Sequence, residues 1–268
     1  MLFLALPLTT VPVADAEPGY SGPVPTITDD AIVLDSRAFR DRDLLVTVLT
    51  RNDGVQRGVF RRSRGGRAPQ AGAVQIMSEV RCSLYRGPHA ELATFREVEL
   101  ITSSYGLASR LETAAAAQVV AETLRLFCPE NEPAPRRYRL GVTLLKSLLA
   151  GIEPDAAIAY GQIWCLKLGG LLPPLSICGQ CGVALGPSPR WTDSARQLHC
   201  ADCLANGNHL VEADMAFLRV ALQSSPIDLR TRPGASLQRW LDELIREVAE
   251  CRLGALDFFR AHAAQPRS

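Results

Sequence analysis

The spacing of hydrophobic residues changes about one third of the way along the chain. From Asp30 to about Ser103 the apolar residues fall in five short runs typical of β-strands. These runs are Ala31–Leu34, Leu44–Thr50, Val55–Phe60, Val74–Tyr85 and Glu91–Leu100. Asn52-Asp53-Gly54 predicts a hairpin turn between the second and third runs. Five short strands separated by turns predict a small closed β-barrel of the OB type.

From Tyr105 onward the apolar residues recur every three or four positions, as they do on one face of a helix. The first such stretch runs from Leu107 to Phe127. Two more helices are predicted, over about 137–150 and from Pro154 to Gly169-Gly170, a pair typical of a helix C-terminus. Together these stretches predict a helical domain that follows the barrel.

The C-terminal part continues the helical pattern. Asp214 is expected to cap a short helix that ends near Leu222, and residues 226–234 are predicted to form a loop. Ser236 is expected to cap a last long helix with one apolar stripe, from Leu237 to Phe258, that includes Cys251. We expect this stripe to pack against the other helices, and a coiled-coil partner is the alternative.

These elements predict an α+β protein of several domains. A disordered extension over residues 1–28 precedes an OB-fold barrel over 29–104. The helical domain has two parts, 105–175 and 208–263. A cysteine-rich module over 176–207 is inserted between them, and a short tail covers 264–268.

The N-terminal extension contains an apolar run, from Leu2 to Val13, followed by Ala14-x-Ala16. This order is typical of a secretory signal, but no lysine or arginine precedes the run and two prolines interrupt it. We therefore expect a disordered segment or translation from an upstream start, with export as the alternative. No later segment is long and apolar enough to cross a membrane, so a cytoplasmic location is expected.

Four of the eight cysteines form two Cys-x-x-Cys pairs, Cys178/Cys181 and Cys200/Cys203, with eighteen residues between them. This spacing is typical of a tetrahedral zinc site, and four thiolates leave no open position, so one structural Zn²⁺ per chain is predicted. A thioredoxin-like redox pair and a disulfide knot are the alternatives. His199 and His209 are expected to be loop residues, and the lone Cys82, Cys128 and Cys165 are expected, like Cys251, to lie in the core.

The charge pattern places a basic patch on the barrel. The net charge is only +1, but residues 51–67 contain six arginines and one acid. We expect the Gly-rich, arginine-rich loop at the end of this run to bind the phosphates of nucleic acid, and Arg37, Arg40 and Arg42 to extend the patch. A solvated loop without a ligand is the alternative interpretation.

Motifs of catalysis are hard to find in this sequence. Asp41 and Asp43 form an Asp-x-Asp pair, but arginines flank them, and a surface ion-pair network is expected there. Neither a phosphate-binding Walker loop nor a Gly-x-Ser-x-Gly elbow is present. The sequence therefore favours a binding protein over an enzyme. A DNA ligase fragment is disfavoured because neither Lys146 nor Lys167 stands in a Lys-x-Asp-Gly context.

The order of these parts resembles the RecO family of recombination mediators and DNA-annealing proteins. The resemblance rests on DDAIVL (29–34), DRDLLVTVLTRNDGVQRGVFRRSR (41–64) and LYRGPHAELATFREVELI (84–101), followed by helices and the CGQCG and CADC segments. It covers about residues 29–259. The segment 65–73 is less typical of the family than its flanks, so Arg67 is a weaker candidate for a DNA contact.

The resemblance implies an OB-fold followed by a helical domain that carries a zinc module in many members. It implies binding of single- and double-stranded DNA, strand annealing, and joint action with RecR to load RecA onto DNA coated by single-stranded DNA-binding protein (SSB), whose acidic tail such proteins contact. By matching positions, the resemblance implies that Arg57, Arg61, Arg62 and Arg64 contact DNA. No nucleotide hydrolysis is implied. A zinc-ribbon adaptor that docks on proteins, with no annealing activity of its own, is the alternative function.

Overall fold

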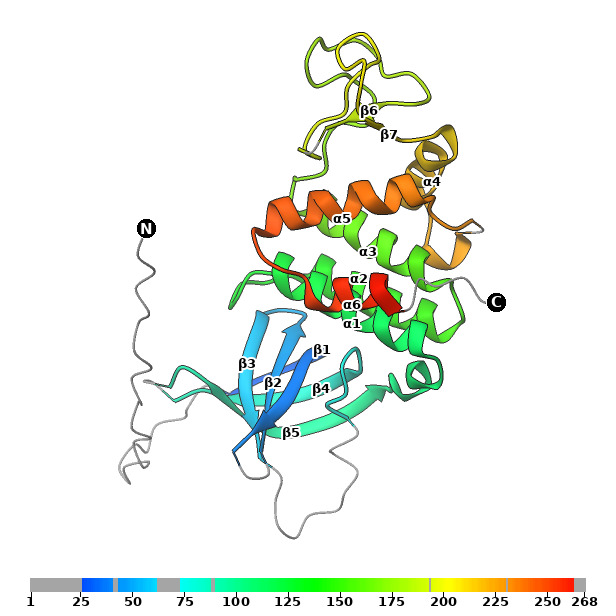
Figure 1. The fold of residues 1–268 in the computed structure, drawn as a ribbon. Coiled ribbons are helices and arrows are strands. Elements are labelled where there is room, and N and C mark those ends of the chain that lie inside the picture. The colour runs from blue at the N-terminus through cyan, green and yellow to red at the C-terminus, as the bar shows by residue number, and fades with distance from the viewer. Residues whose placement is uncertain are drawn as a thin grey trace, which may run out of the picture.

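The chain folds into three stacked parts: a β-barrel, a layer of helices and a small module at the far end (Figure 1). The computed structural model describes residues 26–40, 43–61, 73–87, 90–192, 194–229 and 231–262. Most of the predicted N-terminal extension and the predicted tail lie outside these residues. The first described element, β1, begins at Thr26, slightly before Asp29, where the barrel domain was predicted to start.

Five strands close the barrel in the order β1-β2-β3-β5-β4. They are β1 (Thr26–Phe39), β2 (Asp43–Thr50), β3 (Gly54–Phe60), β4 (Glu79–Tyr85) and β5 (Ala93–Thr102). All neighbours are antiparallel except β3 and β5, which pair in parallel and so complete the closure. The predicted barrel is confirmed, but the strand expected over 74–85 begins only at Glu79, because residues 73–77 form turns.

The helical layer contains α1 (Leu111–Phe127), α2 (Pro135–Leu149), α3 (Pro154–Leu168), α4 (Glu212–Gln223), α5 (Ala235–Ala249) and α6 (Gly254–His262). Short 3₁₀ turns, η2 (Tyr105–Ser109) and η3 (Pro226–Asp228), precede α1 and α5. Proline occupies the first turn of both α2 and α3, where its missing N–H has no helical partner to lose. Within the described residues, no helix combines the length and apolar character that crossing a membrane requires.

The barrel and the helices share one hydrophobic core. Ile32, Leu49 and Met77 are fully buried in the barrel and belong to the same cluster as the apolar faces of the helices. The β2–β3 turn also bonds to the connection between α1 and α2, where the Val55 N–H donates to the Pro129 carbonyl (2.9 Å). At Gly54, φ is +66° and an added Cβ would lie 2.1 Å from the Glu132 carbonyl oxygen, so this contact requires glycine.

A buried hydrogen bond joins α2 to the barrel and gives a stability prediction. The Tyr138 hydroxyl donates to the Glu79 carboxylate (2.9 Å), which also accepts from Thr102. Tyr138→Phe should lower the free energy of unfolding by about 1–3 kcal/mol, because a buried charged acceptor loses a donor. Urea unfolding measures this loss. The matched control is Tyr105→Phe, because the exposed Tyr105 ring makes no hydroxyl hydrogen bond to a described residue; an equal loss in both variants would contradict the assignment.

The predicted long C-terminal helix is wrong in one respect, because the chain breaks it between α5 and α6. Glu250 adopts a left-handed conformation (φ 50°) and ends α5. Cys251, expected in the core, is therefore exposed, whereas Cys82, Cys128 and Cys165 are buried as predicted.

The short helix α6 packs back on α1, α3 and α5. Glu122 of α1 accepts the Ala255 N–H at the start of α6 (3.1 Å). The Arg260 guanidinium binds Asp242 of α5 and Asp155 of α3, each at 2.7 Å. These contacts favour the break over a continuous helix, because a straight continuation of α5 would leave Asp242 without its guanidinium partner.

Both predicted caps are also corrected. Asp214 lies inside the first turn of α4 rather than at its N-cap, and its carboxylate accepts the N–H groups of Val211 (3.1 Å) and Gly234 (3.2 Å). Ser236 lies inside α5 and donates its hydroxyl hydrogen bond to Asp214. One buried carboxylate thus serves the N-termini of two helices, where negative charge is favoured by the helix dipole.

Candidate metal centre and nucleic-acid interface

The module between α3 and α4 is organised around the four cysteines. Two short strands, β6 (Arg190–Trp191) and β7 (Asn208–His209), pair next to the cluster. The first Cys-x-x-Cys pair sits on a tight turn in which the Gly182 N–H donates to the Cys178 carbonyl (2.9 Å), with Gly182 at φ +73°. The second pair returns to the same point, and the Cys200 N–H faces the Cys178 sulfur at 3.4 Å.

The four sulfur atoms fit a tetrahedral metal ion. The sulfurs of Cys178, Cys181, Cys200 and Cys203 all lie within 4.8 Å of one another, and those of Cys181 and Cys200 are 3.7 Å apart. Four thiolates at ~2.3 Å from one Zn²⁺ would be separated by ~3.8 Å, so little rearrangement is needed. Neither His199 nor His209 joins this group in the described part of the chain. Both were expected in loops, but His209 belongs to β7 and His199 forms a β-bridge with Arg190.

Backbone N–H groups prepare the site for a cation. Donors at Cys181, Cys200 and Gln180 lower the pKa of the Cys178 thiol to about 5. The pKa of Cys203 is raised instead, because its thiol donates hydrogen bonds to the sulfurs of Cys181 and Cys200, which favours the protonated form. A bound cation would favour the thiolate form of all four cysteines, because its positive charge offsets theirs.

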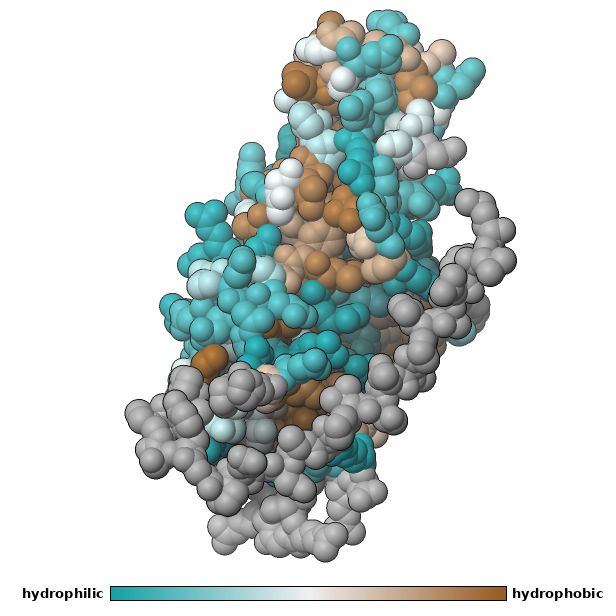
Figure 2. All heavy atoms as spheres, turned by 90° about the vertical axis from the view of Figure 1, so that its left-hand side faces the viewer, coloured by the Kyte–Doolittle hydropathy of each residue, from teal (hydrophilic) through white to brown (hydrophobic). Residues whose placement is uncertain are grey.

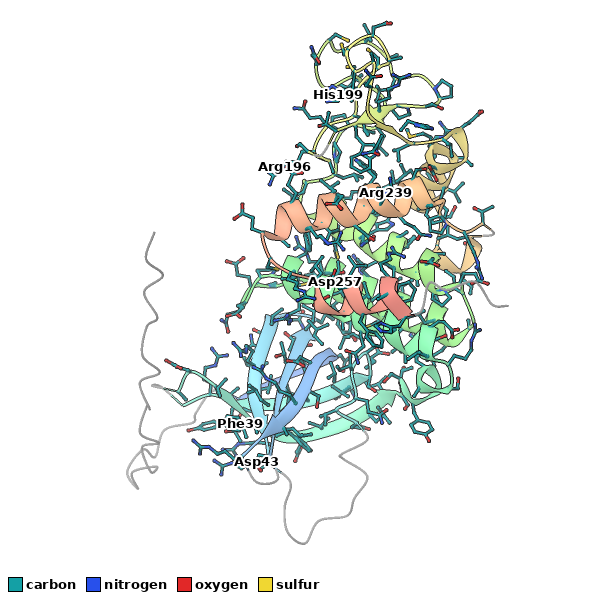
Figure 3. All side chains as sticks on the ribbon, viewed as in Figure 1. Phe39, Asp43, Arg196, His199, Arg239 and Asp257 are labelled. Atoms are coloured by element: carbon teal, nitrogen blue, oxygen red, sulfur yellow. The ribbon has the colours of Figure 1, made fainter. Side chains whose placement is uncertain are left out.

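The module is anchored on α5 through a few specific contacts. The buried Trp240 side chain donates its Nε1–H to the Ala195 carbonyl (3.0 Å). The Glu247 carboxylate accepts the Ala195 N–H (3.1 Å) and binds Arg196 (2.7 Å). Figure 3 shows Arg196 between the module and α5, below His199. The cysteine module is thus attached to the helical layer through α5.

The predicted DNA-contact arginines that the structure describes lie on the barrel and are exposed. Arg57 projects from β3, Arg61 follows its end, and Arg40 lies after β1 with φ 48° and its guanidinium 5.3 Å from the Phe39 ring centroid. None of the three forms an ion pair with a described carboxylate, unlike Arg81, which binds Asp30 at 2.9 Å.

Several of the predicted contacts cannot be placed. Arg42, Arg62, Arg64 and Arg67 lie outside the described residues, as does Asp41. Asp43, predicted to join an ion-pair network, makes no ion pair within the described part. Phe39 and Asp43 mark the outer end of the barrel, opposite the module that contains His199 (Figure 3). The arginines near β1 and the cysteine cluster therefore occupy opposite ends of the molecule.

A second candidate site, a groove of about 320 Å³ between α2 and α3, was not predicted from the sequence. Arg136 and Arg139 lie on one wall, and Tyr160, Trp164 and Leu168 on the other. Lys167 adds a cation, with its ammonium 4.5 Å from the Trp164 ring centroid. The signals in the sequence were the basic segment Pro135-Arg-Arg-Tyr-Arg and the Trp164/Lys167 spacing, which become meaningful only when α2 and α3 are known to be neighbours.

The hydropathy of the surface differs between the parts of the molecule. On the face shown in Figure 2, hydrophobic side chains gather over the middle of the helical layer, and hydrophilic ones cover most of the described surface around them.

Comparisons with known proteins cover both main parts of the chain. The family model described as "Recombination protein O N terminal" matches residues 24–104, and "Recombination protein O C terminal" matches 108–257. A DNA repair protein RecO from Koribacter versatilis is 27% identical over 84% of this chain and 94% of its own. Proteins of the same name from Symbiobacterium thermophilum (29%, 82% of this chain and 86% of its own) and Myxococcus xanthus (27%, 86% and 95%) are also similar.

Proposed function

Because the chain belongs to the RecO family of DNA repair proteins, we propose that it binds single- and double-stranded DNA and anneals complementary strands. With RecR, it would help to load RecA onto DNA coated by SSB, and so would act in the cytoplasm on the nucleoid. The observation that carries this proposal is the set of exposed arginines without carboxylate partners, Arg40, Arg57 and Arg61, on an OB-like barrel.

The proposed mechanism is electrostatic. Two complementary strands repel each other through their phosphates, and a protein that contacts several phosphates at once lowers this repulsion. Guanidinium groups suit this role because each can donate two parallel hydrogen bonds to one phosphate. Arg42, Arg62 and Arg64 are proposed to extend the same surface. No covalent step is required, so the protein is proposed to act as a mediator without catalysis.

We propose that the cysteine cluster holds one structural Zn²⁺ through Cys178, Cys181, Cys200 and Cys203. A bound ion would compensate the charge of the four thiolates, and this would stabilise the folded module. Two observations support a structural role for this ion. The cluster lies far from the described barrel arginines, and a closed shell of four sulfurs leaves no position for a substrate.

The groove between α2 and α3 is proposed to bind the acidic tail of SSB. Its arginines would pair with carboxylates, and its aromatic wall would take a large apolar side chain. The double variant Arg136→Glu, Arg139→Glu should weaken binding of an SSB tail peptide about tenfold or more, because both cations become repulsive. Fluorescence anisotropy of a labelled peptide measures this change.

Two controls sharpen that measurement. Arg239→Glu with Arg252→Glu makes the same change of charge on exposed residues away from the groove and should leave peptide affinity nearly unchanged. Binding to bare oligonucleotides should survive in the groove variant. Equal losses of peptide binding in both double variants would place the tail elsewhere.

The function as a whole is tested by oligonucleotide binding with and without RecR. Wild-type protein should bind both single strands and duplexes at low salt. Weak, non-specific binding under these conditions would favour the alternative, a zinc-ribbon adaptor that docks on proteins.

A further inference from the structure

The junction between the barrel and α1 contains a cavity of about 480 Å³ with no charged side chain in its lining. Its apolar walls come from the barrel end and from α1: Leu44, Val74, Ile76, Leu107, Ala114 and Ala117. Tyr105 lies at the edge of this cavity, with 72% of the residue exposed. An exposed aromatic ring beside an apolar cavity is suited to a flat ligand that stacks.

Two amide side chains in this cavity have free hydrogen-bonding groups. Gln75 and Gln118 contribute to the lining, and neither side chain makes a hydrogen bond to another described residue. The hydroxyl of Ser104, by contrast, is already bonded to that of Ser78 (3.0 Å). An amide offers both a donor and an acceptor, the combination that pairs with the edge of a nucleobase.

A second cavity, of about 320 Å³, adjoins the first, and Ile76 and Gln118 line both. Three arginines line it: Arg37 of β1, Arg57 of β3 and Arg125 of α1. Arg57 and Arg125 form no ion pair with a described carboxylate, and Arg37 is only within 3.9 Å of Asp35.

Three carboxylates also line the second cavity: Asp35, which lies within 3.9 Å of Arg37, and Glu122 and Glu130. Glu122 accepts the Ala255 N–H at the start of α6, so its charge is partly offset by that helix terminus. Glu130 is exposed at the rim and can turn toward solvent. The guanidiniums of Arg57 and Arg125 therefore remain available to an anion.

We propose that these adjoining cavities form a binding site for one unstacked nucleotide of a single DNA strand. The base would enter the neutral cavity, stack on Tyr105 and pair with Gln75 or Gln118. The flanking phosphates would bind Arg37, Arg57 and Arg125. This inference rests on the proposed DNA-binding function and adds Arg125, a residue of the helical layer, to a surface otherwise confined to the barrel.

The site would distinguish single strands from duplexes. A base inside a duplex is stacked and paired, and moving it out costs free energy, whereas a base in a single strand is already accessible. Base stacking on aromatic side chains is tolerant of sequence, because every base presents a flat face. The same protein would thus use the barrel arginines for either form of DNA and the junction site for single strands alone.

The test uses the full-length protein and three ligands: a 12-nucleotide single strand, the same backbone with abasic sites throughout, and a 12-base-pair duplex. Ala114→Phe would fill the neutral cavity, and Ala216→Phe on α4 is the matched control. Ala114→Phe should weaken binding of the single strand about fivefold or more while leaving the abasic strand and the duplex unchanged. Gln118→Leu keeps the volume of the cavity and should also weaken binding of the single strand. This second variant keeps the proposal testable if Ala114→Phe fails to fold.

The possible outcomes separate this inference from the proposed function. If wild-type protein binds the ordinary strand no better than the abasic one, or if both cavity variants leave the single-strand affinity unchanged, the base site is wrong. Equal losses on all three ligands would also overturn it. Competition by free AMP as strong as that by the strand would indicate a small-molecule site instead. If the wild type binds none of the three, the proposed DNA-binding function itself fails.

Discussion

Replacing Cys200 with serine is expected to remove the metal ion and unfold the cysteine module. Structural zinc sites of this kind contribute an apparent binding free energy of about 10–16 kcal/mol at neutral pH. A serine hydroxyl remains protonated and is a poor ligand for Zn²⁺. The module buries few large side chains of its own besides Trp191, so little else would hold it together. Metal analysis should give about one zinc per wild-type chain and far less in the variant.

The chain offers a matched control for this experiment. Cys251 is exposed and lies outside the cluster, so Cys251→Ser should leave metal content and stability unchanged. Acidification provides a second check: protons compete with the ion for the four sulfurs, so metal retention should weaken as the pH falls. Full metal occupancy in Cys200→Ser would mean that the ligand set is wrong.

Replacing Arg61, Arg62 and Arg64 with alanine is expected to weaken DNA binding with little dependence on sequence. Each lost phosphate contact should reduce the slope of log affinity against log salt by ~0.7–0.9, so three lost contacts should reduce it by ~2–3. Titration of a labelled oligonucleotide at several salt concentrations measures this slope directly.

The control for the arginine variant must change the net charge by the same amount. Arg219, Arg239 and Arg252 are exposed on the helical part of the molecule, and their triple replacement by alanine also removes three positive charges. This control should retain nearly the wild-type slope. If the barrel variant keeps the wild-type slope, or if both triple variants change it equally, DNA does not bind at the barrel arginines.

The barrel was predictable because its strands are marked locally. The runs around Val46, Val55 and Phe95 are bounded by turn residues, and their buried side chains form the barrel core or face the helices. Residues 73–77 have the same apolar composition as a strand but form turns. Met77 there adopts a left-handed conformation (φ 67°) and is fully buried against the helices, a requirement that no local pattern reveals.

The break between α5 and α6 is a second feature that hydrophobic periodicity did not predict. The stripe through Leu237, Leu244 and Cys251 has a regular helical spacing, so hydrophobic periodicity alone predicts no break. The break depends on tertiary contacts, since Arg260 can reach Asp242 and Asp155 only if α6 folds back. Gly254, at the start of α6, was the one available signal.

The candidate sites also differ in how far the sequence predicts them. The cysteine cluster was predictable because each Cys-x-x-Cys pair is a local unit, and two such units imply one ion. The α2–α3 groove and the junction cavities were not predictable from the sequence. Only tertiary packing brings Arg139 close to Trp164 in the groove, and Gln75 close to Gln118 at the junction.

The most direct measurement is the rate at which complementary oligonucleotides anneal when both are coated with SSB, followed by fluorescence transfer. The wild-type protein should accelerate annealing at low salt, RecR should modify that rate, and the variant lacking Arg61, Arg62 and Arg64 should be slower than the triple control on the helical layer. If SSB-coated strands anneal no faster with the wild-type protein than without it, the proposed annealing function is wrong.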